Sequence, residues 1–274
     1  MTSKKLTLQD FSHSKNQQHK LSMLTCYDYT FAQILNQSDI NILLVGDSGA
    51  MTQQGYPNTT HATIEMMCTM TQAVAAGAPD KFIVADMPFL THKQGIEHAT
   101  QCAAQLIRSG AHALKIEGLA GHEHIIKHLI ESGLPVMGHL GLTPQSVHSQ
   151  GYQVQGQEEH QAQLILDQAL ILQSIGCFSL VLECVPNTLA QDITQTLHIP
   201  TIGIGAGSEV DGQVLVLQDM LGMTTDFKPK FVRHFLEGFS LIHTACNTFH
   251  QAIQTHDYPS TQESYFTTEQ TGTT

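Results

Sequence analysis

The sequence predicts a (β/α)8 barrel, the α/β fold also called a TIM barrel. Short runs rich in Val, Ile and Leu recur eight times, with stretches of helical character between them. The runs are apolar throughout, which is typical of parallel strands in a sheet that helices cover on both faces. Eight such units fit in about 220 of the 274 residues, a usual length for this barrel. A doubly wound open sheet is the competing fold, because a strand count from sequence can err by one or two.

The predicted strands and helices alternate along the chain. The strands are expected at residues 21–25, 41–46, 82–86, 112–117, 135–140, 178–183, 200–205 and 213–217. Helices are expected at residues 64–76, 95–109, 122–131, 161–174, 188–197 and, longer than the others, 231–253. A glycine follows four of the helices, where a left-handed C-cap is expected. These glycines are Gly77, Gly110, Gly133 and Gly176.

A single domain is expected to hold the whole active site. No shift in composition and no repeat beyond the βα alternation divides the chain before its C-terminal part. We expect one catalytic barrel domain over residues 1–255, with helical additions at its N-terminal and C-terminal ends. Residues 256–274 are polar and lack periodicity, so we predict a disordered tail there. The long helix at 231–253 is expected to cover the barrel or to contact another subunit.

Charge and hydropathy exclude some classes of partner. The formal net charge is −12, from 12 Lys and Arg against 24 Asp and Glu, and no basic run is longer than Lys4–Lys5. Such a surface repels nucleic-acid phosphates and anionic lipid. No segment approaches the roughly 18 apolar residues of a membrane span, and the N-terminal segment lacks the apolar stretch of a signal peptide. We therefore expect no nucleic-acid partner, no membrane partner and a cytoplasmic location.

The six cysteines are predicted to be free thiols. They lie far apart in the sequence, form no CxxC pair and mostly stand within apolar runs. A disulfide framework is not expected in so long and apolar a chain.

Acidic residues follow most of the predicted strands. In this fold the C-terminal ends of all strands meet on one face, where the active site lies. Taken singly, each such residue is more often the cap of the next helix than a ligand. Together, converging carboxylates repel one another unless a cation lies between them, and oxygen ligands with retained water suit Mg²⁺. The residues are Asp28, Asp47, Asp86, Glu117 and Glu183, with Asp219 as a sixth after the last strand.

Lys115 stands two residues before Glu117 on one predicted strand. Side chains alternate along a strand with a period of two, so both should face the barrel interior. An interior lysine could form a Schiff base or pair with an anionic substrate, while the structural alternative is a buried ion pair. A metal ion beside a cationic side chain suits a small oxo acid that carries a carboxylate. Glu183, on a different strand, is left free to act as a base.

The run GIGAG at residues 203–207 is a weak nucleotide-binding signal. It follows a predicted strand, but Ser208 stands where the dinucleotide-binding fingerprint has its third glycine. We interpret the run as a tight turn at the barrel rim, whose backbone N–H groups could approach a ligand.

Seven motifs make the chain resemble one enzyme family. They are TCYDYTFA, LLVGDS, ADMPF, IRSGAHALKIEG, GHLGLTPQS, VLECVP and IPTIGIGAG, in the family's order over roughly residues 20–235. The run GHLGLTPQS, followed by GYQVQG, is the most specific. In these motifs the chain resembles the ketopantoate hydroxymethyltransferases, which are the 3-methyl-2-oxobutanoate hydroxymethyltransferases of pantothenate biosynthesis.

The resemblance implies a fold, a reaction and an assembly. Members of the family fold as (β/α)8 barrels and form homo-oligomers, often decamers. They transfer a hydroxymethyl group from methylenetetrahydrofolate to 3-methyl-2-oxobutanoate and give 2-dehydropantoate, the first step of pantothenate biosynthesis. The reaction passes through an enolate that Mg²⁺ stabilises.

The resemblance also implies the roles of individual residues. The family's Mg²⁺ ligands correspond to Asp47, Asp86 and Glu117, and its proton acceptor corresponds to Glu183. The oxo acid is expected to bind at the residues Asp47, Ser48, Asp86, Lys115 and His139. Carried over in this way, the roles agree with the site inferred from the strand ends.

The chain departs from the family pattern at several positions. Where the family usually reads GDSLGM, this chain reads GDSGAM, with Gly49 and Ala50 directly after Ser48. Met70 stands in place of a usual histidine. Basic residues common in the family are replaced at Ala75, Ala76, Gln153 and Gln157. We expect catalysis to be retained, and folate affinity or subunit contacts to be weaker.

Two other functions fit the same acidic residues. One is another Mg²⁺-dependent lyase or mutase that forms enolates of small 2-oxo acids. The other is a barrel that binds metabolites or a partner without turnover, as the altered loop and the lost basic residues suggest. The intact acidic set favours the transferase.

Overall fold

The eight strands form a closed barrel. The structure, a computed structural model, describes residues 5–225 and 228–266, without the side chains of residues 149 and 150. Neighbouring strands pair in parallel in chain order, and β8 pairs with β1. The strands are β1 (Leu21–Thr25), β2 (Ile42–Val45), β3 (Phe82–Asp86), β4 (Ala113–Glu117), β5 (Val136–Gly141), β6 (Ser179–Glu183), β7 (Thr201–Ile204) and β8 (Gly212–Leu215). The predicted (β/α)8 barrel is confirmed, and the open sheet is wrong because β1 and β8 are not edges.

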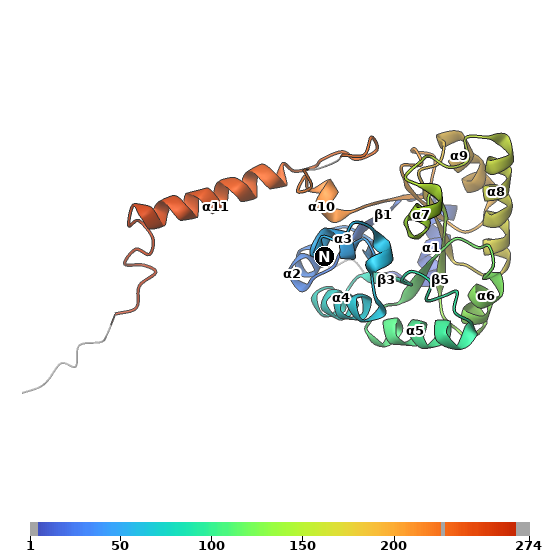
Figure 1. Ribbon diagram of the computed structural model, residues 1–274, viewed down its shortest axis with the longest axis horizontal. Coiled ribbons are helices and arrows are strands. Elements are labelled where there is room, and N and C mark those ends of the chain that lie inside the picture. The colour runs from blue at the N-terminus through green and yellow to red at the C-terminus, as the bar shows by residue number, and fades with distance from the viewer. Residues whose placement is uncertain (1–4, 226–227, 267–274) are drawn as a thin grey trace, which may run out of the picture. The chain divides into compact units, whose positions relative to one another are not determined.

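Helices surround the strands of the barrel (Figure 1). In the barrel they are α1 (Leu8–Asn16), α2 (Tyr29–Asn36), α3 (Gly49–Gln54), α4 (Ile64–Gly77), α5 (Ile96–Arg108), α6 (Glu123–Glu131), α7 (Val147–Gln150), α8 (Glu159–Ser174) and α9 (Asn187–Thr196), with 3₁₀ turns at Thr59–His61 and Pro144–Ser146. Two further helices follow, α10 (Leu217–Met220) and α11 (Gly238–Gln254). The predicted helices that correspond to α4, α5, α6, α8 and α9 agree within two residues at each end.

The last helix begins later than predicted. It starts at Gly238, whereas the prediction began at residue 231. Residues 230–232 make their contacts with the barrel, where Val232 is buried and the ring of Phe231 approaches Gly205. The apolar side chains at 231 and 232 therefore reflect burial against the barrel rather than one face of a helix.

Contacts divide the described chain into two compact units. One holds the barrel, up to residue 217 and with residues 230–232, and the other holds residues 218–225, 228–229 and 233–266. The second unit contains α11 and then turns, without helix or strand, as far as residue 266. The predicted domain over residues 1–255 and the disordered tail stay predictions, and residues 267–274 lie outside the described residues. Within the described ranges, no helix has the length and apolar character needed to cross a membrane.

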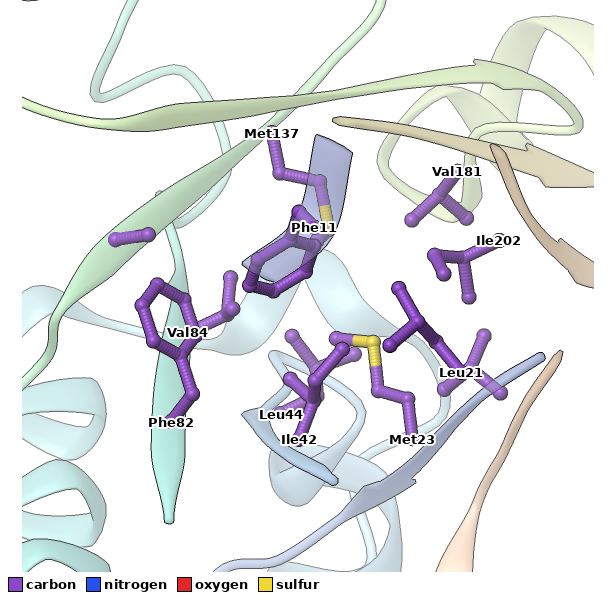
Figure 2. Close-up of a cluster of buried hydrophobic side chains, with 12 residues drawn as sticks. Phe11, Leu21, Met23, Ile42, Leu44, Phe82, Val84, Met137, Val181 and Ile202 are labelled. Carbon is purple, nitrogen blue, oxygen red and sulfur yellow. The ribbon is translucent and has the colours of Figure 1, made fainter. Parts of the chain in front are cut away.

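Apolar side chains from every strand fill one end of the barrel interior. Phe11 of α1 lies among them, and Figure 2 shows its ring between side chains of several strands. The Phe11 ring centroid is 5.0 Å from that of Phe82 and 4.9 Å from that of Phe178, both edge-on. Fully burying a side chain of this kind contributes roughly 1.5–3 kcal/mol. Because α1 and these apolar side chains fill this end of the barrel interior, the inward-facing charged residues lie at the other end of the strands.

Gly77 has a different role from the one predicted. It is the last residue of α4 and is not left-handed, so its expected C-cap is wrong. A Cβ at this position would lie 2.7 Å from both the carbonyl oxygen of Tyr29 and the Cβ of Ala32. Gly77 therefore lets α4 approach α2 closely. The other three predicted caps are left-handed, with φ of 111° at Gly110, 89° at Gly133 and 102° at Gly176.

Replacing Gly77 with Ala should lower the free energy of unfolding by about 1–3 kcal/mol, the usual effect of overpacking. A helix otherwise favours Ala over Gly by about 1 kcal/mol, so the contact with α2 decides the sign. Chemical denaturation measures the change. An increase in stability would show that the close approach of α2 and α4 is not required.

Candidate active site

The inward face of the barrel changes from apolar to polar along the strands. Apolar inward residues on β3, β4, β5 and β6 are followed two positions later by a charged residue or a histidine, which the period of two turns inward as well. These pairs are Val84 and Asp86, Ala113 and Lys115, Met137 and His139, and Val181 and Glu183. Strand register places Asp86 beside Lys115 and Glu117 beside His139. Together with Asp47 and Ser48, these polar residues line a cavity of about 90 Å³.

Asp47 and Ser48 lie in the turn between β2 and α3. The backbone N–H of Asp47 donates to Oδ2 of Asp86 at 3.1 Å, which ties the turn to β3. The hydroxyl oxygen of Ser48 is 2.9 Å from the phenol oxygen of Tyr27. Burial raises the pKa of Tyr27, so its hydroxyl keeps a proton that it can donate. The contact with Ser48 was not predicted from the sequence.

Lys115 is the cation among three buried carboxylates. Its Nζ lies 3.1 Å from Oδ1 of Asp86 and 3.8 Å from Oε1 of Glu117. Burial lowers the pKa of Lys115, but the charges of Asp86, Glu117 and Asp47 outweigh it and raise this pKa. Burial first, and then neighbouring carboxylates, raise the pKa of Asp47 and of Asp86, although Lys115 opposes this. Burial raises the pKa of Glu117, but His139, Lys115 and the N–H of Gln145 outweigh it and lower this pKa. The ammonium group therefore leaves Asp47 and Asp86 incompletely compensated, and a further cation would be stabilised beside them.

His139 links Lys115 to Glu183. Its Nδ1 lies 3.1 Å from Nζ of Lys115, and its Nε2 lies 3.3 Å from Oε2 of Glu183. Burial and Lys115 lower the pKa of His139, but hydrogen bonds to Glu117 and Glu183 outweigh them and raise it. If Nδ1 accepts from Lys115, the neutral ring carries its proton on Nε2, and the charged ring has a proton on both nitrogens. In both states an N–H group of His139 faces Glu183 and can orient its carboxylate.

Gln145 is a site residue that sequence reasoning missed. Its backbone N–H donates to Oε2 of Glu117 at 3.0 Å. Its side-chain Nε2 donates to Oδ2 of Asp47 at 2.8 Å and to the carbonyl oxygen of Met87 at 2.9 Å. Gln145 thus holds two of the predicted metal ligands in place. It stands in the motif GHLGLTPQS, and that membership was the only available signal.

The acidic residues supply oxygen donors for a divalent cation. In the described part of the chain, Oδ1 of Asp86 and Oε1 of Glu117 are buried and make ion-pair contacts with Lys115 but no hydrogen bond. No three His, Cys, Asp or Glu side chains of the described residues are arranged to hold a metal ion, and Lys115 contacts two of the predicted ligands. Mg²⁺ often takes only one or two carboxylates and completes its coordination with water and substrate oxygens. The donor chemistry of Asp47, Asp86 and Glu117 therefore fits Mg²⁺.

Two predicted strand-end carboxylates are not among the residues that line this cavity. Asp28 accepts a hydrogen bond from the backbone N–H of Phe31 at 2.9 Å and so caps α2, as the structural alternative predicts. Asp219 lies within α10 rather than at the end of a strand, so its place in the acidic set is wrong. The interpretation of GIGAG as a turn is confirmed, because Gly205 and Gly207 directly follow β7 with φ of 64° and 80°.

The departures at Gly49 and Met70 are neighbours in space. A Cβ on Gly49 would lie 2.6 Å from Sδ of Met70 and 2.8 Å from Cδ1 of Tyr27. Met70 therefore occupies the space that a side chain at position 49 would need. The missing leucine-like side chain in GDSGAM and the methionine on α4 compensate one another, beside the Tyr27 that contacts Ser48.

Two buried histidines, His92 and His122, lie close to Glu117. The ring centroids of His92 and His122 are 4.6 Å apart, and each residue is 1% exposed. Nδ1 of His122 donates to the carbonyl oxygen of Ala120 at 3.1 Å, which leaves Nε2 as the unprotonated nitrogen of the neutral ring. Burial, and then the neighbouring His122, lower the pKa of His92 to about 3. Burial, and then the charge of Lys93, lower the pKa of His122 as well, so both rings stay neutral at pH 7.

Replacing His92 with Leu should make the protein less sensitive to acid. The pKa of His92 is about 3 in the folded chain and 6.5 without burial, so between these values the unfolded state binds the proton more readily. Stability is then lost as the pH falls from 6.5, by up to about 2 kcal/mol at pH 5. Denaturant unfolding at pH 7 and pH 5 should show a smaller loss in H92L than in the parent. Equal losses would contradict this prediction.

Sequence comparisons place nearly the whole chain in one family. Residues 5–261 match the family profile described as ketopantoate hydroxymethyltransferase. The chain is 53% identical to the 3-methyl-2-oxobutanoate hydroxymethyltransferase of Francisella tularensis subsp. tularensis (strain WY96-3418), over 93% of this chain and 97% of that protein. It is 52% identical to the protein of the same name from Bdellovibrio bacteriovorus, over 94% of this chain and 99% of that protein.

Solved structures share the fold at low sequence identity. Phosphonopyruvate hydrolase, crystallised with oxalate and Mg²⁺, matches with a TM-score of 0.61 and 9% identity over 93% of this chain and 92% of that one. Phosphoenolpyruvate phosphomutase from Streptomyces platensis subsp. rosaceus matches with a TM-score of 0.62 and 10% identity, over 94% and 93% of the two chains. At these identities the likeness concerns the barrel alone. The sequence matches confirm the resemblance carried by the seven motifs and favour it over a lyase or mutase. The chain belongs to the ketopantoate hydroxymethyltransferase family.

Proposed function

We propose that the chain transfers a hydroxymethyl group from methylenetetrahydrofolate to 3-methyl-2-oxobutanoate and gives 2-dehydropantoate, the first step of pantothenate biosynthesis. The observation that carries this proposal is the division of the site into two parts. Lys115 and three buried carboxylates form a charged floor, while Glu183 is more exposed and faces His139 instead. The floor suits the carboxylate and oxo group of a small acid. A separate carboxylate is then free to act on the neighbouring carbon.

Asp47, Asp86 and Glu117 would hold Mg²⁺, which supplies, when bound, positive charge that makes the C–H bond next to the oxo group more acidic. Lys115 is proposed to neutralise the substrate carboxylate, because its ammonium group is the buried cation on this floor. Ser48 is proposed to donate a hydrogen bond to the oxo acid, positioned by its contact with Tyr27.

Glu183 is proposed to take the proton from C3 of the oxo acid. Nε2 of His139 lies 3.3 Å from Oε2 of Glu183, so an N–H group there can orient this carboxylate. The side chain of Glu183 is 17% exposed, against 4% for Asp86 and Glu117. The one-carbon unit is bound to two nitrogens of the carrier, and both C–N bonds break. The electron pair left on C3 replaces one of them with the new C–C bond, and the hydroxyl that water supplies replaces the other. The proton taken by Glu183 and one proton from water pass to the two nitrogens, and tetrahydrofolate leaves.

A folate-dependent assay with and without Mg²⁺ tests this function. With the oxo acid and Mg²⁺ in D₂O, the protein should exchange the C3 proton in the absence of the carrier. It should form 2-dehydropantoate only when methylenetetrahydrofolate is added, and EDTA should suppress both activities. Exchange without any folate-dependent product would favour a lyase or mutase that uses the same carboxylates. Binding of the oxo acid without either activity would favour a barrel without turnover.

We also propose that the chain acts as a homo-oligomer, with the decamer of the family as the expected form. In support, α11 exposes several large apolar side chains, which are unusual on a free surface. They are Phe239, Leu241, Ile242, Phe249 and Ile253, between 42% and 56% exposed. Light scattering at micromolar concentration gives the assembly size, and a monomer would contradict the proposal.

A cytoplasmic location is proposed as well. All six cysteines are free thiols, as predicted, and three of them are buried. Free thiols in this number fit a reducing compartment.

A further inference from the structure

The catalytic cavity is too small for the one-carbon carrier. It measures about 90 Å³, whereas pockets that enclose drug-sized ligands usually measure about 300–1,000 Å³. The branched oxo acid, with five carbon and three oxygen atoms, is small by comparison with a folate. The heterocycle of the carrier must therefore rest outside the cavity, on the side from which its methylene carbon can reach the carbon that Glu183 deprotonates.

The loop at residues 151–157 lies beside Glu183. The backbone N–H of Gln155 donates to the carbonyl oxygen of Cys184 at 2.8 Å, and Cys184 directly follows Glu183. At the other end of the loop, the N–H of Gly156 donates to Oε1 of Gln161 at 3.0 Å. These bonds fix the loop between β6 and α8. Residues a few positions before Gln155 are consequently held near the base.

Tyr152 and Val154 are exposed apolar side chains on this loop. Tyr152 is 59% exposed and Val154 is 47% exposed, although neither lies on a helix or strand. Partial burial, and then the charges of Glu183, Asp47 and Glu117, raise the pKa of Tyr152. Its phenol ring is therefore within electrostatic reach of three carboxylates of the site. Tyr152 is not among the residues that line the cavity, and its exposed ring lies outside it.

We propose that Tyr152, with Val154 beside it, is the surface on which the flat heterocycle of the one-carbon carrier stacks during transfer. This inference rests on the proposed function and adds specificity residues for its second substrate. An exposed aromatic ring binds a flat heterocycle through its face at little cost in conformational entropy. The position beside Glu183 brings the carrier to the carbon that becomes nucleophilic.

Two assays separate this inference from the proposed function. Exchange of the C3 proton in D₂O needs the oxo acid and no carrier, whereas product formation needs both. Replacing Tyr152 with Ala should raise the KM for methylenetetrahydrofolate by roughly 5- to 150-fold, the range that ring stacking produces, and leave the exchange rate within about twofold. Tyr152→Phe keeps the ring and should stay within about twofold of the parent in both assays. Val154→Ala should raise the same KM by a smaller factor.

Matched control variants test whether the effect on the carrier depends on the position of the ring. Tyr29 is also an exposed tyrosine, at 48%, so Tyr29→Ala controls for the loss of a surface ring and should change neither assay. Leu164→Ala reports on a neighbouring cavity of about 230 Å³, which Gln155 and Leu164 help to line. Fluorescence titration with tetrahydrofolate in the presence of the oxo acid gives the affinity without turnover, and Y152A should weaken it by the same factor.

Three results would overturn the inference while the transferase activity stands. They are an unchanged KM for the carrier in Y152A, a loss in Y152F as large as in Y152A, and a rise in KM for L164A but not for Y152A. A parallel loss of proton exchange in Y152A would also overturn it, because Tyr152 would then act on the oxo acid or on Glu183. If the parent chain exchanges the C3 proton but makes no folate-dependent product, the proposed function fails, and this inference fails with it.

Discussion

Replacing Glu183 with Gln is expected to slow exchange of the C3 proton by about 10²–10⁴-fold, the usual contribution of a general base. Glutamine keeps the size of the side chain but cannot accept the proton. Glu183 is outside the predicted metal set, and in the site it lies beside His139 rather than Lys115. Binding of the oxo acid and of Mg²⁺ should therefore stay within a few-fold of the parent while both exchange and product formation fall together.

Exchange followed by NMR in D₂O, with calorimetry for oxo-acid binding, measures both parts of this prediction. Glu158→Gln is a matched control, because Glu158 is exposed and its side chain makes no capping hydrogen bond. The control should retain both activities. If E183Q exchanged the proton at the parent rate, another group would be the base and the assignment of Glu183 would be wrong.

The inward-facing part of the site could be predicted because it follows from strand geometry. Once β4 is recognised, the period of two places Lys115 and Glu117 on the same face as Ala113. Pairing of consecutive strands then brings Asp86 next to Lys115, since β3 pairs with β4. These conclusions need only the pattern within each strand and the fold class, and the sequence carries both.

The contacts made by loops could not be predicted in this way. Gln145 reaches Asp47 and Met87 across 98 and 58 residues, and nothing local in the sequence indicates which side chain a loop residue will meet. The relation between the substitutions at Gly49 and Met70 could not be predicted either. In the sequence they read as separate losses, whereas the structure shows that one side chain fills the space vacated by the other.

Replacing Lys115 with Met is expected to lower the free energy of unfolding by about 3–5 kcal/mol in the absence of Mg²⁺, as removal of one partner from a buried ion pair usually does. Asp47, Asp86 and Glu117 are 3–4% exposed and would be left without the ammonium group that lies among them. Denaturant unfolding at pH 7 in EDTA measures the loss. The matched control is Lys81→Met, because Lys81 is also buried but donates to the carbonyl oxygen of Ser38 rather than to a buried carboxylate. This control should lower the free energy of unfolding by about 1–3 kcal/mol, the usual effect of leaving one buried polar group unpaired.

Mg²⁺ should distinguish the two lysine variants. If the carboxylates around Lys115 bind the ion, loss of the neighbouring positive charge removes a repulsion, so Mg²⁺ should stabilise K115M more than it stabilises the parent. K81M should respond to Mg²⁺ as the parent does, because Lys81 is not among the residues that line the catalytic cavity. An equal response in all three proteins would place the ion away from Asp47, Asp86 and Glu117. A K115M protein as stable as the parent in EDTA would mean that the carboxylates are already neutral in the folded chain, since protonated acids need no ammonium partner.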